Sequence, residues 1–195
     1  MRKGCVVAVA VLLAACGGED DAALDAGAAI AGFAEAPTAA LGFSALNQVA
    51  HLDVEGTRAA ALEAIEGGQG ETLLPAAYAV SLTGIESDDA AALRPLLGHE
   101  DLRIRLLAAQ TLAGAGVGEG MPVLIELLGS EEPLRDGLSV WEVARRTLLD
   151  LSGEDLGLDA ADDVAQAAAT IPTWQDWWAG AAEGFEPRER EAVFG

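Results

Sequence analysis

The apolar positions in the middle of the chain follow a helical pattern that repeats. Three segments spaced 31 residues apart each contain an apolar pair at i and i+3 and end on a glycine. An apolar pair of this spacing followed by glycine is typical of a short helix with its C-cap. The three segments are residues 60–67, 91–98 and 122–129.

A second series of helical segments lies between them. Residues 76–84 match residues 106–114 at a spacing of 30, and partial copies occur at 45–52 and 143–148. The predicted order is one helix of the second series followed by three pairs. Periods near 30 residues with two helices each predict a short α-solenoid of stacked antiparallel helix pairs, an all-α fold. Composition agrees, because Ala and Leu dominate a chain that is 51% hydrophobic.

One repeat carries a family resemblance. Asp101 stands in the inter-helix loop, Ile104-Arg105 opens the second helix, and Ala108 and Leu112 follow at regular spacing. This arrangement resembles the HEAT-repeat family, in particular its lyase-like bacterial subgroup. The resemblance implies a HEAT-like domain over residues 38–152, a kink at Pro95 and second helices that line an inner, protein-binding surface. Residues 129–142 depart from the pattern by an insertion.

The C-terminal part, residues 153–195, is expected to hold an acidic linker, a closing helix and a tail. Trp174, Trp177 and Trp178 stand at i, i+3 and i+4 and therefore share one helix face. Large aromatic side chains gain most from burial, so this face favours a cap over the solenoid end. A sugar-stacking platform is the alternative interpretation.

The N-terminus carries a targeting pattern. Arg2 and Lys3 precede an apolar run at residues 6–13, which is too short to span a bilayer but suits a signal peptide. Leu13-Ala14-Ala15-Cys16 resembles the lipobox of bacterial lipoproteins. The resemblance implies cleavage after residue 15, lipid on Cys16 and attachment on the non-cytoplasmic side of a membrane. Gly17 then favours the outer membrane where a cell has two, and residues 16–37 are predicted to be a flexible acidic tether.

The negative net charge of the chain argues against nucleic acid as a partner. The net charge of −21 repels nucleic-acid phosphates, so we expect a protein partner, whose identity stays open. The polar positions of the second helices include three arginines in a chain with a single lysine. These could form a basic island that binds the partner, or the arginines could merely offset neighbouring acids. The candidate face is Arg103, Gln110, Arg145 and Arg146.

No pattern indicates catalysis, a metal or a cofactor. His51 and His99 are the two histidines, and neither has clustered ligands at the spacing that zinc needs. The glycines from Gly114 to Gly120 follow no predicted strand and join two helices, so they do not match a phosphate-binding loop. Asp88-Asp89 and Asp162-Asp163 are better explained as solvated or capping residues. We therefore expect a non-enzymatic interaction or scaffolding module. The alternatives are a glycan-binding module and an accessory to a lyase-type enzyme.

Overall fold

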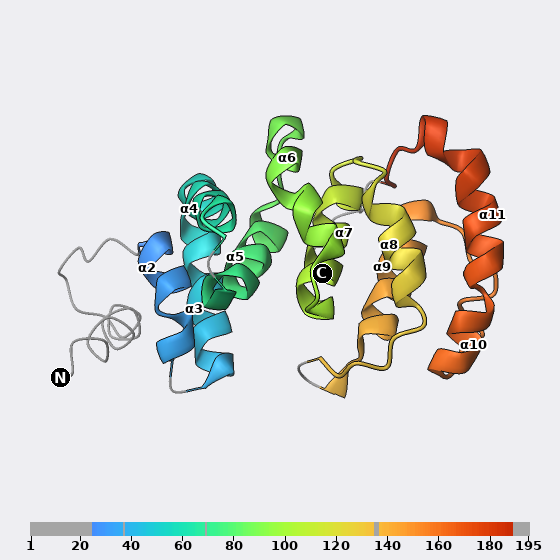
Figure 1. Cartoon of the computed structure of the whole chain (residues 1–195), viewed down its shortest axis with the longest axis horizontal. Coiled ribbons are helices and arrows are strands. Elements are labelled where there is room, and N and C mark those ends of the chain that lie inside the picture. Colours follow the sequence, from blue (N-terminus) through green and yellow to red (C-terminus); the bar gives the residue numbers. More distant parts are fainter. Residues whose placement is uncertain (1–24, 37, 69, 135–136, 189–195) are drawn as a thin grey trace. The chain divides into compact units, whose positions relative to one another are not determined.

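The computed structural model describes residues 25–36, 38–68, 70–134 and 137–188, and it confirms the all-α class for them (Figure 1). Within these ranges the extended backbone pairing is one isolated bridge between Pro133 and Ser139. The described residues divide into two compact units, and the division lies between Ile85 and Glu86. Each unit is described by itself below.

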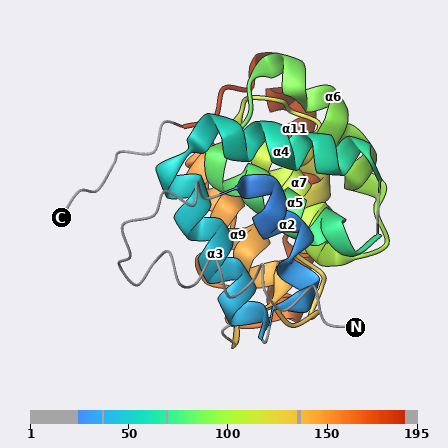
Figure 2. The same ribbon diagram turned by 90° about the vertical axis from the view of Figure 1, so that its left-hand side faces the viewer.

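Unit 1 is built around three helices. These are α3 (Ala39–Leu52), α4 (Val54–Glu66) and α5 (Gly70–Thr83), preceded by α2 (Ala26–Ala31) and the 3₁₀ turn η1 (Phe33–Glu35). α5 packs against α3 and α4, and α2 contacts all three helices (Figure 2). The apolar side chains at helical spacing are buried between them, including Leu46, Val49, Ala61, Ala76 and Val80.

The expected tether over residues 16–37 is wrong in its second half. Residues 26–31 are helical, and Ala26, Ala29 and Ile30 lie buried on one side of α2. Their i, i+3, i+4 spacing forms an apolar stripe that contacts α3, α4 and α5. The Ala- and Gly-rich composition concealed this short helix, because its stability comes from packing rather than from length. Residues 16–24 lie outside the described residues.

Unit 2 contains the remaining helices. α7 packs against η3, α8 and α9, and α11 packs against α8. Trp174 of α11 is enclosed in the same core as Met121, Leu124 and Leu148. The elements are η2 (Ser87–Asp89), α6 (Ala90–Leu93), η3 (Arg94–Gly98), α7 (Leu102–Gly114), α8 (Gly120–Leu127), α9 (Val140–Ser152), α10 (Val164–Ala169), α11 (Ile171–Ala181) and η5 (Ala182–Gly184).

The predicted order of helices agrees with the structure. α3 corresponds to the first member of the second series, and α4, α5, α6 with η3, α7, α8 and α9 follow in the predicted order. The predicted kink at Pro95 appears as a change of helix type, because α6 ends at Leu93 and the 3₁₀ helix η3 begins at Arg94. Proline lacks the N–H that an α-helix needs at this position.

The expected acidic linker at residues 153–171 is also partly folded. It contains α10, and the side chain of Leu158 is fully buried in the core of unit 2. Asp163 caps α10 by accepting a hydrogen bond from the backbone N–H of Gln166, as its position before an Ala-rich stretch indicated. Acidic residues in this segment therefore serve as caps and do not prevent packing.

Candidate binding site on α9

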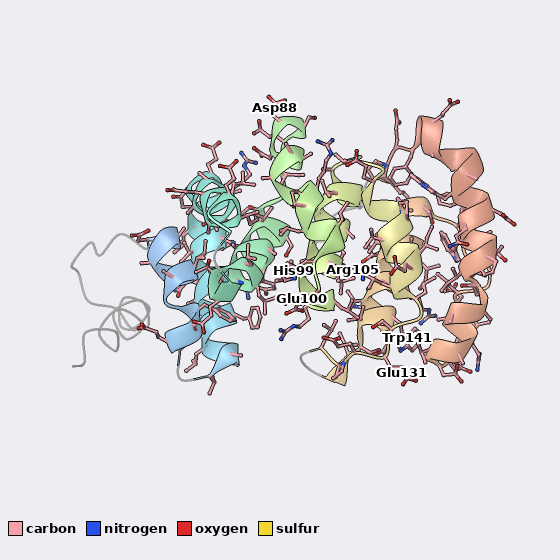
Figure 3. The ribbon with its side chains drawn as sticks, in the orientation of Figure 1. Asp88, His99, Glu100, Arg105, Glu131 and Trp141 are labelled. Carbon is pink, nitrogen blue, oxygen red and sulfur yellow. The ribbon has the colours of Figure 1, made fainter. Side chains whose placement is uncertain are left out.

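One face of α9 gathers the charged residues of interest. Glu142, Arg145, Arg146, Leu149 and Asp150 stand at i, i+3, i+4, i+7 and i+8, so they share one side of the helix. The helix begins with a capping box in which the backbone N–H and the hydroxyl of Ser139 both donate to Oε2 of Glu142, at 2.7 and 2.6 Å. The loop before α9 is held as well, since the backbone N–H of Trp141 donates to the carbonyl of Ser130. Figure 3 labels Glu131, which follows Ser130, and Trp141, which lies in the first turn of α9.

These residues line a shallow pocket of about 180 Å³. Ligand sites for whole small molecules typically measure about 300–1,000 Å³. The pocket is therefore of a size to receive one side chain of a larger partner. Its lining residues are Leu138, Glu142, Arg145, Arg146, Leu149 and Asp150.

Arg145 is held by the backbone of the following loop. Its Nε donates to the carbonyl oxygen of Leu158 at 2.7 Å, and an Nη donates to the carbonyl of Asp159 at 3.1 Å. The carboxylate of Asp159 lies 3.8 Å from the same guanidinium. Arg145 thus joins α9 to the segment before α10, a structural role that sequence reasoning left open.

Glu142 is an ionised capping residue. The hydrogen bond from the Ser139 hydroxyl, followed by that from the Ser139 backbone N–H, lowers the pKa of the Glu142 carboxyl. A carboxyl with a lowered pKa is a poor proton donor near neutral pH. The pocket brings ionisable groups together, but the hydrogen bonds from Ser139 lower the pKa of Glu142, whereas a general acid at neutral pH needs a raised pKa.

The other two candidates do not line the pocket. Gln110 of α7 donates from Nε2 to the hydroxyl of Thr147 on α9 at 2.6 Å, which ties these two helices together. Arg103 pairs with Asp101, with Nη2 2.5 Å from Oδ2, and this hydrogen bond lowers the pKa of the Asp101 carboxyl. The structure therefore brings Arg145 and Arg146 into one pocket, where Glu142 and Asp150 balance their charge.

Sequence reasoning missed the acidic and apolar members of this pocket. The signal was present, because Glu142, Leu149 and Asp150 flank the arginines at spacings of three and four. Leu138 could not be assigned in this way, since it comes from the loop whose path only the fold determines.

The tryptophan face divides into buried and half-buried members. Trp174 is 0% exposed, whereas Trp177 and Trp178 are partly buried against the same core. The ring of Trp177 packs against that of Trp174 at 5.4 Å, and Trp178 packs against Phe185 at 5.2 Å, both edge to face. Trp174 is therefore a core residue and offers no surface for sugar stacking.

His99 and Gly116 have structural roles in the loops at the two ends of α7. His99 is half-buried in the loop before α7, and its Nδ1 accepts a hydrogen bond from the backbone N–H of Asp101 at 3.0 Å (Figure 3). Gly116 has φ +79° and terminates α7 in a Schellman motif, in which Val117 N–H donates to the Leu112 carbonyl. Within the described ranges, no three His, Cys, Asp or Glu side chains are grouped as metal ligands would be.

The described helices are short or polar. No helix among the described residues has the length and apolar character needed to cross a bilayer. Cys16 and the rest of the predicted signal peptide lie outside the described residues.

Comparison with protein-family models, with characterised proteins and with solved structures gives no match.

Proposed function

We propose that the chain is a lipid-anchored, non-enzymatic protein-binding module, in which the pocket on α9 receives one side chain of the partner. The observation that carries this proposal is the pocket itself. Its apolar residues, Leu138 and Leu149, are combined with a charge pattern of two arginines and two carboxylates. A site of this kind selects a partner by charge pattern and by fit of a single side chain.

The architecture supports the proposal. The helices alternate in two series, and within unit 2 the second helices α7 and α9 contact each other while α8 packs against both. This is the neighbour relationship expected of stacked HEAT-like pairs, whose exposed second helices present a continuous binding face. The solenoid arrangement is therefore part of the proposal.

The lipid anchor is proposed from the lipobox-like residues that end at Cys16. More than one acyl chain is needed for stable membrane attachment, and a lipidated N-terminal cysteine carries several. The Cys16→Ala variant should incorporate no labelled palmitate and should be released from membranes. Equal palmitate incorporation by the wild-type and the variant protein would exclude the anchor.

The pocket is tested by charge reversal at Arg146, the arginine with the more exposed side chain. Arg146→Glu should reduce capture of crosslinked partners from intact membranes by at least about tenfold, which corresponds to about 1.4 kcal/mol. The new like-charge pairs with Glu142 and Asp150 should cost only a few tenths of a kcal/mol in stability.

Arg94→Glu is the matched control. Arg94 forms an exposed ion pair with Glu119 and does not line the pocket. The same change of charge there should leave capture unchanged, since exposed pairs contribute about 0–1 kcal/mol. Equal loss of capture by both variants would mean that overall charge, rather than the pocket, governs binding.

Glycan binding remains the second candidate because Trp177 and Trp178 are only partly buried. A titration with soluble cell-wall oligosaccharides tests it by tryptophan fluorescence. A saturable change in emission that is lost in Trp178→Ala would favour this second function.

A further inference from the structure

The described part of unit 1 begins at Asp25. The carboxylate of Asp25 accepts hydrogen bonds from the backbone N–H groups of Gly27 and Ala28, at 2.9 and 3.3 Å, and so caps α2. Ile30 of this helix is 2% exposed, and burial of its apolar side chain stabilises the attachment of α2. Residue 25 is thus held to the body of unit 1.

A second attachment follows within a few residues. The ring of Phe33 packs edge to face on Phe43 at 4.8 Å, and Phe43 packs on Tyr78 at 4.6 Å. The side-chain amide of Asn47 donates to the hydroxyl of Tyr78 at 3.0 Å. These contacts fix η1 to α3 and α5. We call residues 25–36, comprising α2 and η1, the strap.

The strap limits the distance between a lipid-anchored Cys16 and the body of unit 1. Eight residues lie between Cys16 and Asp25, and a chain spans at most about 3.6 Å per residue, so Asp25 lies within about 32 Å of the anchored cysteine. Without the strap the first attached residue would be in α3, and the limit would exceed about 70 Å. Packing of the strap therefore shortens the reach of unit 1 by about half.

We propose that the strap acts as a length regulator that confines unit 1 to the layer next to the anchoring membrane. This proposal rests on the proposed lipid anchor. The bilayer is a poor ligand for unit 1, because its described residues carry seven carboxylates and one arginine, Arg58. Repulsion from anionic headgroups extends over only about 8 Å at physiological ionic strength, which the tether can accommodate.

The distance is measurable by energy transfer. Lipidated protein with Glu66→Cys, an exposed position on α4, is labelled with a donor dye and placed in phosphatidylcholine vesicles that contain acceptor-labelled headgroups. The proposed signal cleavage removes Cys5 and lipid blocks Cys16, so the label is unique. Two variants lengthen the connection: an insertion of 12 Gly and Ser residues after Asp20, and Ile30→Asp with Phe33→Ala, which detaches the strap.

Transfer should be high in the unmodified protein and in an Ala34→Ser control, which changes an exposed strap residue. It should fall in both lengthened variants, provided circular dichroism shows that the helices persist. Equal energy transfer in all four proteins overturns the proposal. If that equal transfer is also high, the result would mean that unit 1 binds the bilayer itself. Absence of palmitate in the starting protein would instead defeat the lipid anchor.

Discussion

The ring of Phe33 lies against the backbone of Gly42, so closely that a Cβ at position 42 would stand 2.7 Å from Cδ2 of the ring. Gly42 belongs to α3 and Phe33 to η1, and the absence of a side chain lets the two elements meet. This contact belongs to the attachment that turns the second half of the expected tether into a part of unit 1.

Gly42→Ala should displace the Phe33 ring and destabilise unit 1. Overpacking of this kind costs about 1–3 kcal/mol, less the gain of about 1 kcal/mol for alanine in a helix. Urea unfolding measures the net change. Gly180→Ala in α11 is the control, because a Cβ there meets nothing within 4 Å and should stabilise the helix. A stabilising effect at both positions would show that Phe33 does not occupy this place.

Trp174→Ala should be the most damaging of the three tryptophan substitutions. The side chain is 0% exposed, and removal of a buried large aromatic costs about 3–5 kcal/mol. Trp177→Ala and Trp178→Ala should cost less, because both side chains are partly exposed. Thermal unfolding of the three variants gives the ranking. A larger loss at Trp178 than at Trp174 would contradict the arrangement of this helix.

Gly120→Ala should strongly destabilise unit 2. A Cβ at this position would lie 2.3 Å from the carbonyl oxygen of Ala109, so α8 could not approach α7 as it does. Backbone atoms cannot move aside as a flexible side chain can, and we expect a loss of about 3 kcal/mol. Gly98→Ala, where nothing lies within 4 Å, is the control for denaturant unfolding. Similar stabilities for the two variants would exclude the close packing of α7 and α8.

Glu142→Gln should change how stability depends on pH. The pKa of Glu142 is lowered in the folded chain by hydrogen bonds from Ser139. A lowered pKa stabilises the fold at pH values above the unfolded pKa, and the contribution disappears as the pH falls through the folded pKa. The wild type should therefore exceed Glu142→Gln in stability at about pH 7, and the difference should diminish as the pH falls through the folded pKa of Glu142.

Melting temperatures of both proteins across this range provide the measurement. Glu131→Gln is a control at an exposed glutamate for which the structure gives no capping role. A constant difference between wild type and Glu142→Gln at every pH would show that the capping box is not formed by an ionised carboxylate.

The sequence by itself determined the helical class and the order of the helices. Apolar positions at spacings of three and four, closed by glycines, predicted where α4, α5 and α7 form, because an amphipathic stripe and a cap are local properties. It also located Pro95 as the place where an α-helix cannot continue. The lipid anchor and the partner remain predictions.

Only the tertiary structure decided what the ambiguous residues do. The fold alone shows that the candidate binding residue Arg145 also has a structural role, because its Nε donates to the Leu158 carbonyl. Residues 26–36 had the composition of a tether, yet Ile30 and Phe33 find apolar partners on α3, α4 and α5. The physical reason is that a short helix or a lone arginine gains little from its own neighbours in the chain. Whether a short helix forms, and what an arginine binds, depends on surfaces that distant segments supply. These surfaces do not exist until the chain has folded.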